Sequence, residues 1–220
     1  MINLPNFKKT FTYENDFYLS CKTDRIAKLV SHYELFRLAE QIPGDMIECG
    51  VFKGASFSRF AMFRELSKNT LQKKIIGFDT FGKFPNTSFK NDNKSRKNFI
   101  KVAGGTSISK NQLINVLKNK GITKKIELIK GDITKTVPKY VKSHPKLKIS
   151  LLNLDTDIYE PAVTILEYLY PKISKGGILI LDDYKVFPGE TKAVNDYFKD
   201  KKVSIKKFSF SKTPYYIIKK

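Results

Sequence analysis

The chain alternates short apolar runs with longer segments in which apolar residues recur every three or four positions. Nearly continuous apolar runs of about 4–8 residues are typical of strands that are covered on both faces. Such runs predict strands at residues 46–50, 73–79, 126–132, 148–155 and 176–183. Because helical patterns separate these runs, the sequence predicts an α/β fold with a mostly parallel sheet and helices on both of its faces.

Helical periodicity marks the segments between and after these runs. The expected helices lie at residues 24–42, 58–68, 107–121, 161–173 and 190–200. Pro161 suits the first turn of its helix, and Gly121 suits a C-terminal cap. Two alternating stretches, residues 203–210 and 214–220, are predicted to close the sheet as an antiparallel pair, which gives seven strands in all.

Two segments show no steady period. Residues 1–24 are rich in aromatic side chains and are expected to be irregular, serving as a lid or as a subunit contact. Residues 82–106 carry turn residues and charges, and are expected to form a long mobile loop. Because no repeat or linker divides the chain, a single domain over residues 1–220 is predicted.

The formal net charge of +20 is the most unusual bulk property of the chain. Of the 41 basic residues only five are arginine, and the lysines are spread along the whole sequence. Since base-specific DNA recognition depends on arginine, this distribution favours a lysine-rich solvated surface. Attraction to an anionic partner, such as a nucleotide-linked sugar or a nucleic acid, remains an alternative.

Nothing in the sequence predicts a secreted or membrane protein. There is no apolar run of about 18 residues, and the first residues lack the apolar region of a signal peptide. Cys21 and Cys49 offer no disulfide framework, and Cys49 is expected to be a small buried residue. We therefore expect a cytoplasmic protein, with structural or surface roles for His32 and His144.

Acidic residues fall at or just after the end of every expected parallel strand. They are Glu48, Asp79, Asp132, Asp155 and Asp182. The carboxyl ends of parallel strands meet at one edge of a sheet, where open α/β folds bind their ligands. Acids at the end of all five strands are better explained by a ligand-binding site at this edge than by a general need for soluble surface residues.

The stretch ECGVFKGAS and two of these acids predict a nucleoside site. Gly50 and Gly54 flank a tight strand-to-helix turn, where the backbone can approach a ligand closely. Asp79 is placed to accept hydrogen bonds from both ribose hydroxyls, and Asp132 to hold an adenine amino group or its surrounding loop. By itself the glycine spacing is equally compatible with a plain turn, and it matches neither a dinucleotide nor a P-loop motif.

Four aspartates at the ends of two neighbouring strands predict a cation site. Asp155 and Asp157 follow one strand, and Asp182 and Asp183 follow the next. Four carboxylates in one cleft repel each other unless protons or a cation intervene. Oxygen ligands without histidine or cysteine suit Mg²⁺, or else Mn²⁺ or Ca²⁺. The alternative is a metal-free structural pair, in which Asp157 caps the helix near Pro161.

Several stretches together resemble the S-adenosylmethionine-dependent sugar O-methyltransferases of the macrocin, mycinamicin and novobiocin type. The matching stretches are PGDMIECGVFKGAS, GFDTFGKFP, LDTDIYEPA, LYPKISKGGILILDDY and AVNDYF. The resemblance extends from about Asp24 to Phe198, and LDTDIYEP with GGILILDDY is its most specific part. It implies a Rossmann-like class I methyltransferase fold, S-adenosylmethionine and Mg²⁺ as cofactors, and a sugar hydroxyl as the acceptor.

The resemblance also implies roles for individual residues. Asp155, Asp182 and Asp183 would bind the metal, and Asp157 would act as general base. The residues implied around S-adenosylmethionine are Glu48, Gly50, Val51, Phe52, Gly54, Ser56, Asp79, Thr80, Asp132 and Ile133. The acceptor is expected to be a glycan, a nucleotide sugar or a sugar-bearing natural product, and a homo-oligomer is implied.

Three other functions stay open at this point. A catechol-type acceptor is one, because metal-dependent catechol methyltransferases also use acidic strand ends. Nucleic-acid methylation is suggested by the positive charge, but the chain has no NPPY-like motif and no separate basic module, so we expect no nucleic-acid partner. The third is a protein that binds the cofactor without catalysing a reaction.

Overall fold

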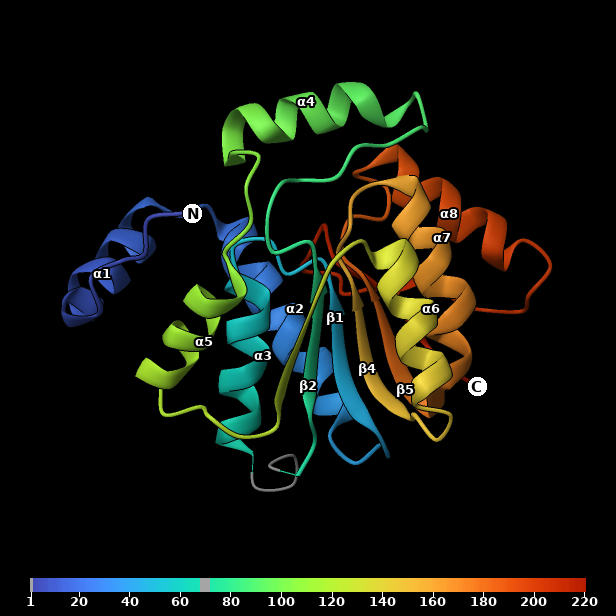
Figure 1. Cartoon of the computed structure of the whole chain (residues 1–220), viewed down its shortest axis with the longest axis horizontal. Coiled ribbons are helices and arrows are strands. Elements are labelled where there is room, and N and C mark those ends of the chain that lie inside the picture. Colours follow the sequence, from blue (N-terminus) through green and yellow to red (C-terminus); the bar gives the residue numbers. More distant parts are fainter. Residues whose placement is uncertain (1, 68–71) are drawn as a thin grey trace.

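Within the described part of the chain, seven strands form one central sheet (Figure 1). They are β1 (Asp45–Cys49), β2 (Ile75–Asp79), β3 (Ile126–Lys130), β4 (Ile149–Leu154), β5 (Ile173–Leu181), β6 (Lys206–Lys207) and β7 (Tyr215–Ile218). Their order is β3-β2-β1-β4-β5-β7-β6, with β1 to β5 parallel and β7 antiparallel to both β5 and β6. This computed structural model describes residues 2–67 and 72–220. The predicted mostly parallel sheet with an antiparallel C-terminal strand is confirmed.

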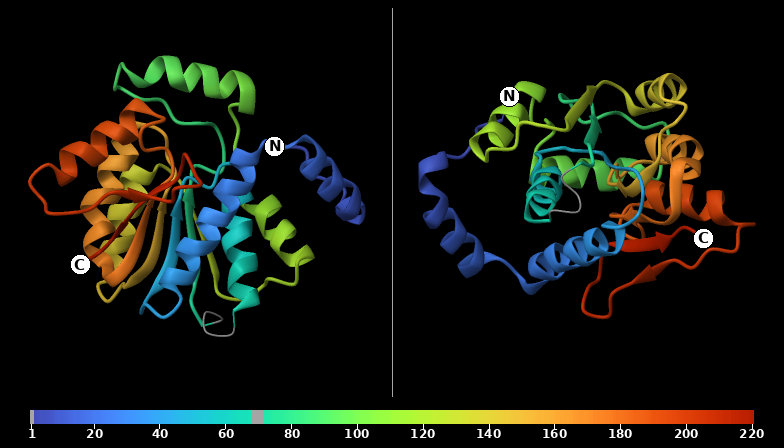
Figure 2. Two further views of the ribbon diagram at one scale, coloured as in Figure 1. Left: turned by 180° about the vertical axis from the view of Figure 1, so that it is seen from behind. Right: turned by 90° about the horizontal axis from the view of Figure 1, so that it is seen from below.

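Helices cover both faces of the sheet (Figures 1 and 2). The α-helices are α1 (Thr10–Ser20), α2 (Thr23–Ala39), α3 (Ala55–Leu66), α4 (Asp92–Ala103), α5 (Lys110–Asn119), α6 (Ile133–Ser143), α7 (Tyr159–Tyr168) and α8 (Pro188–Phe198), and the 3₁₀ turns are η1 (Phe7–Lys9) and η3 (Tyr170–Lys172). α2, α3 and α5 lie on one face, and α6, α7 and α8 lie on the other. The expected end of α3 at Lys68 lies outside the described residues.

Two apolar layers hold these helices against the sheet. On one face Val137, Ile165 and Val194, from α6, α7 and α8, are completely buried against strand residues. On the other face Phe36 and Phe57, from α2 and α3, pack in the same way. Burial of large side chains on both faces is the main stabilising contribution in such a fold, and it fixes the strand ends in space. The carboxyl ends of β1 to β5 therefore form a rigid edge.

The N-terminal segment is more regular than the sequence predicted. Residues 1–24 were expected to be irregular, yet they contain η1 and α1. No side chain of α1 is buried, and the helix projects from the body of the molecule (Figure 2). The chain start is tethered separately, because the Gln112 side chain donates a hydrogen bond to the carbonyl of Ile2 at 2.7 Å. Whether α1 serves as a lid or as a subunit contact stays a prediction.

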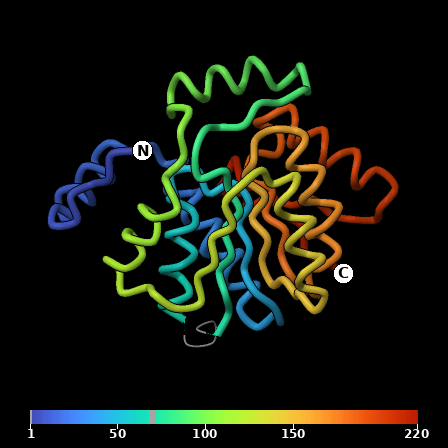
Figure 3. The backbone as a smooth tube through the Cα atoms, in the orientation of Figure 1, coloured from blue at the N-terminus to red at the C-terminus, as the bar shows by residue number. Residues whose placement is uncertain are grey.

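Helix α4 corrects the expectation of a long loop at residues 82–106. It crosses above the carboxyl edge of the sheet (Figure 3). Its sequence carries few apolar residues, so periodicity alone does not reveal it. The helix is held by Phe99, whose ring lies 5.2 Å from Phe52, 5.5 Å from Phe84 and 6.0 Å from Phe187 between centroids. These partners are distant in sequence, so tertiary packing overrides a weak local signal.

Two further differences concern the second half of the chain. Helix α6 has no counterpart among the expected helices, and it carries Pro138 in its interior, where proline removes a backbone donor. The closing strand expected at residues 203–210 is reduced to the two residues of β6. Among the described residues no helix is both long and apolar enough to cross a membrane.

Candidate active site

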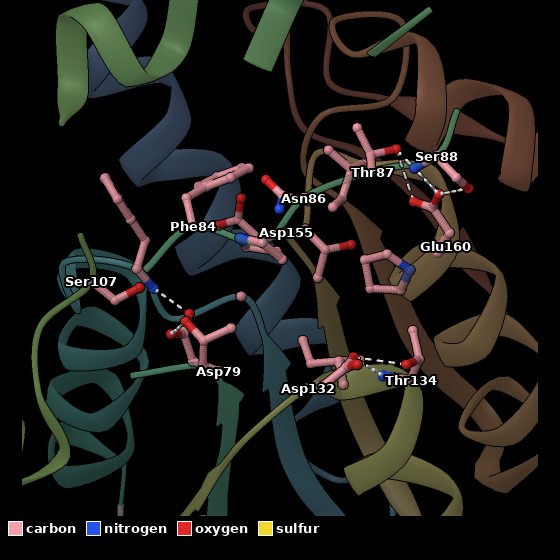
Figure 4. Close-up of a pocket in the computed structure, with 18 residues that line it drawn as sticks. Asp79, Phe84, Asn86, Thr87, Ser88, Ser107, Asp132, Thr134, Asp155 and Glu160 are labelled. Atoms are coloured by element: carbon pink, nitrogen blue, oxygen red, sulfur yellow. Dashed lines mark hydrogen bonds between the residues drawn. The ribbon is translucent and has the colours of Figure 1, made fainter. Parts of the chain in front are cut away.

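A cavity of about 680 Å³ opens at the carboxyl edge of the sheet (Figure 4). Six of the ten residues implied to bind the cofactor line it: Gly50, Phe52, Asp79, Thr80, Asp132 and Ile133. Asp155 also lines it, which joins the cavity to the predicted cation site. Of the other four residues, Val51 and Gly54 are buried within the turn between β1 and α3, and the Ser56 hydroxyl donates a hydrogen bond to Glu48.

The turn after β1 depends on glycine for two reasons. Gly50 has a φ of +92°, a conformation that residues with a Cβ rarely adopt. A Cβ at this position would lie only 1.7 Å from the carbonyl oxygen of Asp155. Gly50 therefore allows the first turn to pack directly against the loop that carries the predicted metal ligands. Glycine at position 50 is therefore required for packing within the protein, and its role in the approach of a ligand stays a prediction.

Two acids on the cavity wall are already engaged by backbone donors. Asp79 accepts hydrogen bonds from the N–H of Phe52 at 2.9 Å and of Phe81 at 2.6 Å, so it fixes the glycine turn. Asp132 caps α6 by accepting from the N–H of Thr134 at 2.9 Å. Carboxylate oxygens have two lone pairs each, so both acids keep acceptor capacity toward the cavity. Figure 4 shows both beside the open space.

One wall of the cavity is a strap, residues 84–89, that runs toward α4. Glu160, in the first turn of α7, accepts hydrogen bonds from the backbone N–H groups of Ser88 at 2.6 Å and Phe89 at 3.2 Å. It also accepts from the hydroxyl of Thr87 at 2.9 Å. These donors lower the pKa of Glu160 despite its partial burial. A single ionised carboxylate thus holds the strap over the cavity (Figure 4).

Replacing Glu160 with Ala is expected to weaken binding of S-adenosylhomocysteine by about tenfold, because several charge-assisted hydrogen bonds that hold the strap are lost. Calorimetric titration measures the affinity. Glu167→Ala is the matched control, since Glu167 lies on the same helix and is exposed. Equal affinities in the two variants would show that the strap does not contribute to ligand binding.

A second carboxylate anchors the start of α4. Asp92 is fully buried and accepts hydrogen bonds from the N–H of Tyr159 at 3.0 Å and of Gly189 at 2.7 Å. These N–H groups belong to the first turns of α7 and α8, so one side chain caps two helices. Burial nevertheless raises the pKa of Asp92. Sequence reasoning missed this residue, because its asparagine-rich surroundings look like solvated loop.

The predicted metal ligands come together in space. One carboxylate oxygen each from Asp155, Asp182 and Asp183 lies within 4.8 Å of the others, and we call these three residues the acidic cluster. Asp155 follows β4 directly, and the two other residues follow the neighbouring β5. Their meeting is a direct consequence of the parallel register. The three side chains supply oxygen ligands alone, which is the donor set that Mg²⁺ prefers.

Asp157 stands beside the acidic cluster in an unusual backbone conformation. Its φ is +63°, in the left-handed region where aspartate and asparagine are tolerated best among residues with a side chain. The turn at this residue brings its carboxyl group close to that of Asp183. The predicted turn of the chain at Asp157 is therefore present.

Mutual repulsion and burial shift the pKa values of these acids. Burial, followed by the charges of Asp182 and Asp183, raises the pKa of Asp155. Burial and the charge of Asp155 raise the pKa of Asp157 to about 7. Glu48, buried within β1, has its pKa raised to about 8, chiefly by burial, although it accepts a hydrogen bond from Ser56 at 2.7 Å. Because these buried carboxylates repel each other, bound protons or a bound cation would stabilise them.

Asp182 is the exception, because helix α2 supplies partners for both of its oxygens. The Lys28 ammonium contacts Oδ2, and the His32 Nε2 atom lies 3.0 Å from Oδ1. Burial would raise the pKa of Asp182, but Lys28 and His32 outweigh it and lower the pKa. Neither partner was assigned to the site from sequence, where His32 was given a structural or surface role. Both lie some 150 positions from Asp182 along the chain.

His32 is itself held in place. Its Nδ1 atom lies 2.9 Å from the guanidinium of Arg59, and its ring stacks on Phe60 with 5.0 Å between centroids. Because arginine can only donate, Nδ1 accepts and Nε2 donates to Asp182, which defines a neutral imidazole. Burial lowers the pKa of His32, in agreement with that state. A further carboxylate, Glu190, accepts from the backbone N–H of Asp183 at 3.0 Å.

Comparison with known proteins gives a consistent picture. The family described as macrocin O-methyltransferase (TylF) matches residues 22–213. The chain is 26% identical over 162 residues to the tetracenomycin rhamnosyl 4'-O-methyltransferase of Streptomyces olivaceus. It is also 26% identical over 168 residues to demethyldecarbamoylnovobiocin O-methyltransferase of Streptomyces niveus. Each alignment covers 73% of this chain and 60% of the relative, so the chain spans less than two thirds of their length.

Solved structures confirm the fold. A calicheamicin methyltransferase superimposes with a TM-score of 0.72 at 24% identity, covering 98% of this chain and 87% of the other. The O-methyltransferase NovP superimposes with a TM-score of 0.69 at 21% identity, covering 87% of this chain and 78% of the other. The Rossmann-like methyltransferase fold expected from the sequence is therefore present.

Proposed function

This chain belongs to the macrocin O-methyltransferase family, and we propose that it is an enzyme that methylates a sugar hydroxyl with S-adenosylmethionine and Mg²⁺. The observation that carries the proposal is the position of Asp155. This residue lines the cavity and is also a member of the acidic cluster. A methyl donor in the cavity and a hydroxyl held beside the cluster are then neighbours.

The cavity residues support S-adenosylmethionine as the methyl donor. Asp79 and Asp132 stand at the ends of β2 and β3 with free acceptor capacity, where ribose hydroxyls and an adenine amino group offer donors. Phe52 and Phe84 add apolar surface to the cavity. The strap held by Glu160 forms a further wall of the cavity. We propose that these residues would hold S-adenosylmethionine, and that Asp155 would join its site to the acidic cluster.

The acidic cluster fits a divalent cation. Its carboxylates are oxygen ligands whose negative charges repel each other at close range, and one of them, Asp182, already contacts the Lys28 ammonium. Asp155, Asp182 and Asp183 are the proposed ligands. When bound, the cation supplies a Lewis acid that lowers the pKa of an alcohol.

Asp157 is the proposed general base. In the reaction the acceptor oxygen forms a bond to the methyl carbon, while the bond from that carbon to sulfur breaks and its electron pair stays on sulfur. The sulfonium becomes a neutral thioether, and the hydroxyl proton passes to the Asp157 carboxylate. Because little new charge develops, positioning of the two reactants supplies much of the acceleration. Asp157 is buried beside Asp183, and its left-handed backbone directs it to this place.

A screen of acceptors with methyl-labelled cofactor tests the proposal. Nucleotide sugars and glycans are the main set, and a catechol and tRNA are the comparison set, each with Mg²⁺ and with EDTA. We expect label on a sugar-containing acceptor, with at least a tenfold lower rate in EDTA, given the usual contribution of a catalytic cation. Methyl transfer to catechol or tRNA alone would overturn the sugar assignment. Equal transfer rates with Mg²⁺ and with EDTA would rule out a role for the metal.

A further inference from the structure

Lys28, on α2, contacts the acidic cluster through Asp182. It sits one helical turn before His32 on α2, so the two side chains point to the same region. Its ammonium contacts Asp182, and its side chain is 24% exposed. One oxygen of Asp182 lies within 4.8 Å of an oxygen from each of Asp155 and Asp183, so the ammonium adjoins the whole acidic cluster.

A metal that binds Asp182 must share this carboxylate with the two partners that Asp182 already has. Its Oδ1 atom faces His32, and its Oδ2 atom faces Lys28. His32 is fully buried, stacked on Phe60 and bonded to Arg59, so it is fixed from three sides. Lys28 instead has a flexible four-carbon stem that reaches solvent. A divalent cation beside Asp182 repels the ammonium and not the neutral imidazole.

We infer that Lys28 is the internal counter-ion of the acidic cluster and that a divalent cation binds by displacing its ammonium. The inference rests on the proposed function for the identity of the metal ligands. In the metal-free protein the Lys28 ammonium offsets part of the negative charge of the cluster and holds the Asp182 carboxylate in place. Lys28 thereby lowers the affinity for metal, while His32 keeps Asp182 oriented in both states.

Lys28→Met tests the inference, because it keeps the length of the side chain and removes the charge. Titration with Mn²⁺, followed by electron paramagnetic resonance, measures the affinity without any acceptor. We expect the affinity of Lys28→Met to rise at least about fivefold, because a competing cation is absent. The metal-free variant should melt at a lower temperature than the wild type, since the cluster has lost its counter-ion. Lys28→Arg keeps the positive charge and should retain the wild-type affinity for Mn²⁺. Lys22→Met, at an exposed position just before the same helix, is the control for loss of a positive charge and should also retain it.

A second measurement uses the wild-type chain and does not depend on folding of a variant. Brief acetylation followed by mass spectrometry measures the reactivity of the Lys28 amine. This reactivity should increase at least about threefold when Mg²⁺ is added, because the ammonium leaves its carboxylate partner. Unchanged or reduced reactivity would overturn the inference, as would equal or weaker Mn²⁺ binding by Lys28→Met. Failure of every form of the protein to bind Mn²⁺ would overturn the metal assignment of the proposed function as well.

Discussion

Asp155→Asn is expected to lower kcat for methyl transfer at least about a hundredfold, because the variant loses one of three proposed carboxylate ligands. Asn keeps the size of the side chain and one oxygen, so the backbone contact of residue 155 with Gly50 is preserved. Mn²⁺ affinity should fall in parallel with kcat. Binding of S-adenosylhomocysteine should change much less, since Asp155 is only one of many residues around the cavity.

The stability of the same variant gives an independent measurement. Burial and neighbouring carboxylates raise the pKa of Asp155, which means that its ionised form is disfavoured in the metal-free protein. Asp155→Asn should therefore melt at an unchanged or higher temperature without metal. Asp196→Asn is the control, because Asp196 is an exposed acid on α8 that pairs with Lys192. Full activity of Asp155→Asn, or a large loss of metal-free stability, would contradict the assigned role.

The position of the site could be predicted from the sequence because the strands are buried on both faces. A nearly continuous apolar run such as ISLLNL has one stable place in an α/β protein, the middle of a parallel sheet. The residue that follows such a run is then forced to the carboxyl edge. This reasoning located Asp79, Asp155 and Asp182 correctly, and the parallel register of β4 and β5 brings the last two together.

The surroundings of the site could not be predicted in the same way. Lys28 and His32 approach Asp182 only because α2 packs across β5, and the spacing of residues in α2 gives no sign of that partner. Asp92 is equally hidden, since its role comes from two helix ends that follow much later in the chain. Contacts of this kind depend on the complete tertiary arrangement, whereas the strand ends depend on local pattern and topology alone.

Asp157→Asn is expected to reduce kcat by about a thousandfold, within the range that a general base contributes, while Mn²⁺ and S-adenosylhomocysteine still bind. Asparagine is the informative substitution, because the φ of +63° at this residue suits Asn and strains Ala. The Asn side chain fills the same space beside Asp183 but cannot accept the hydroxyl proton.

Single-turnover measurement of methyl transfer separates the chemical step from release of product. The two variants can therefore be distinguished. Asp157→Asn should lose turnover and keep its metal affinity, whereas Asp155→Asn should lose both. Retention of more than about a tenth of the wild-type rate in Asp157→Asn would exclude the proton-accepting role, because this loss is smaller than general-base removal produces.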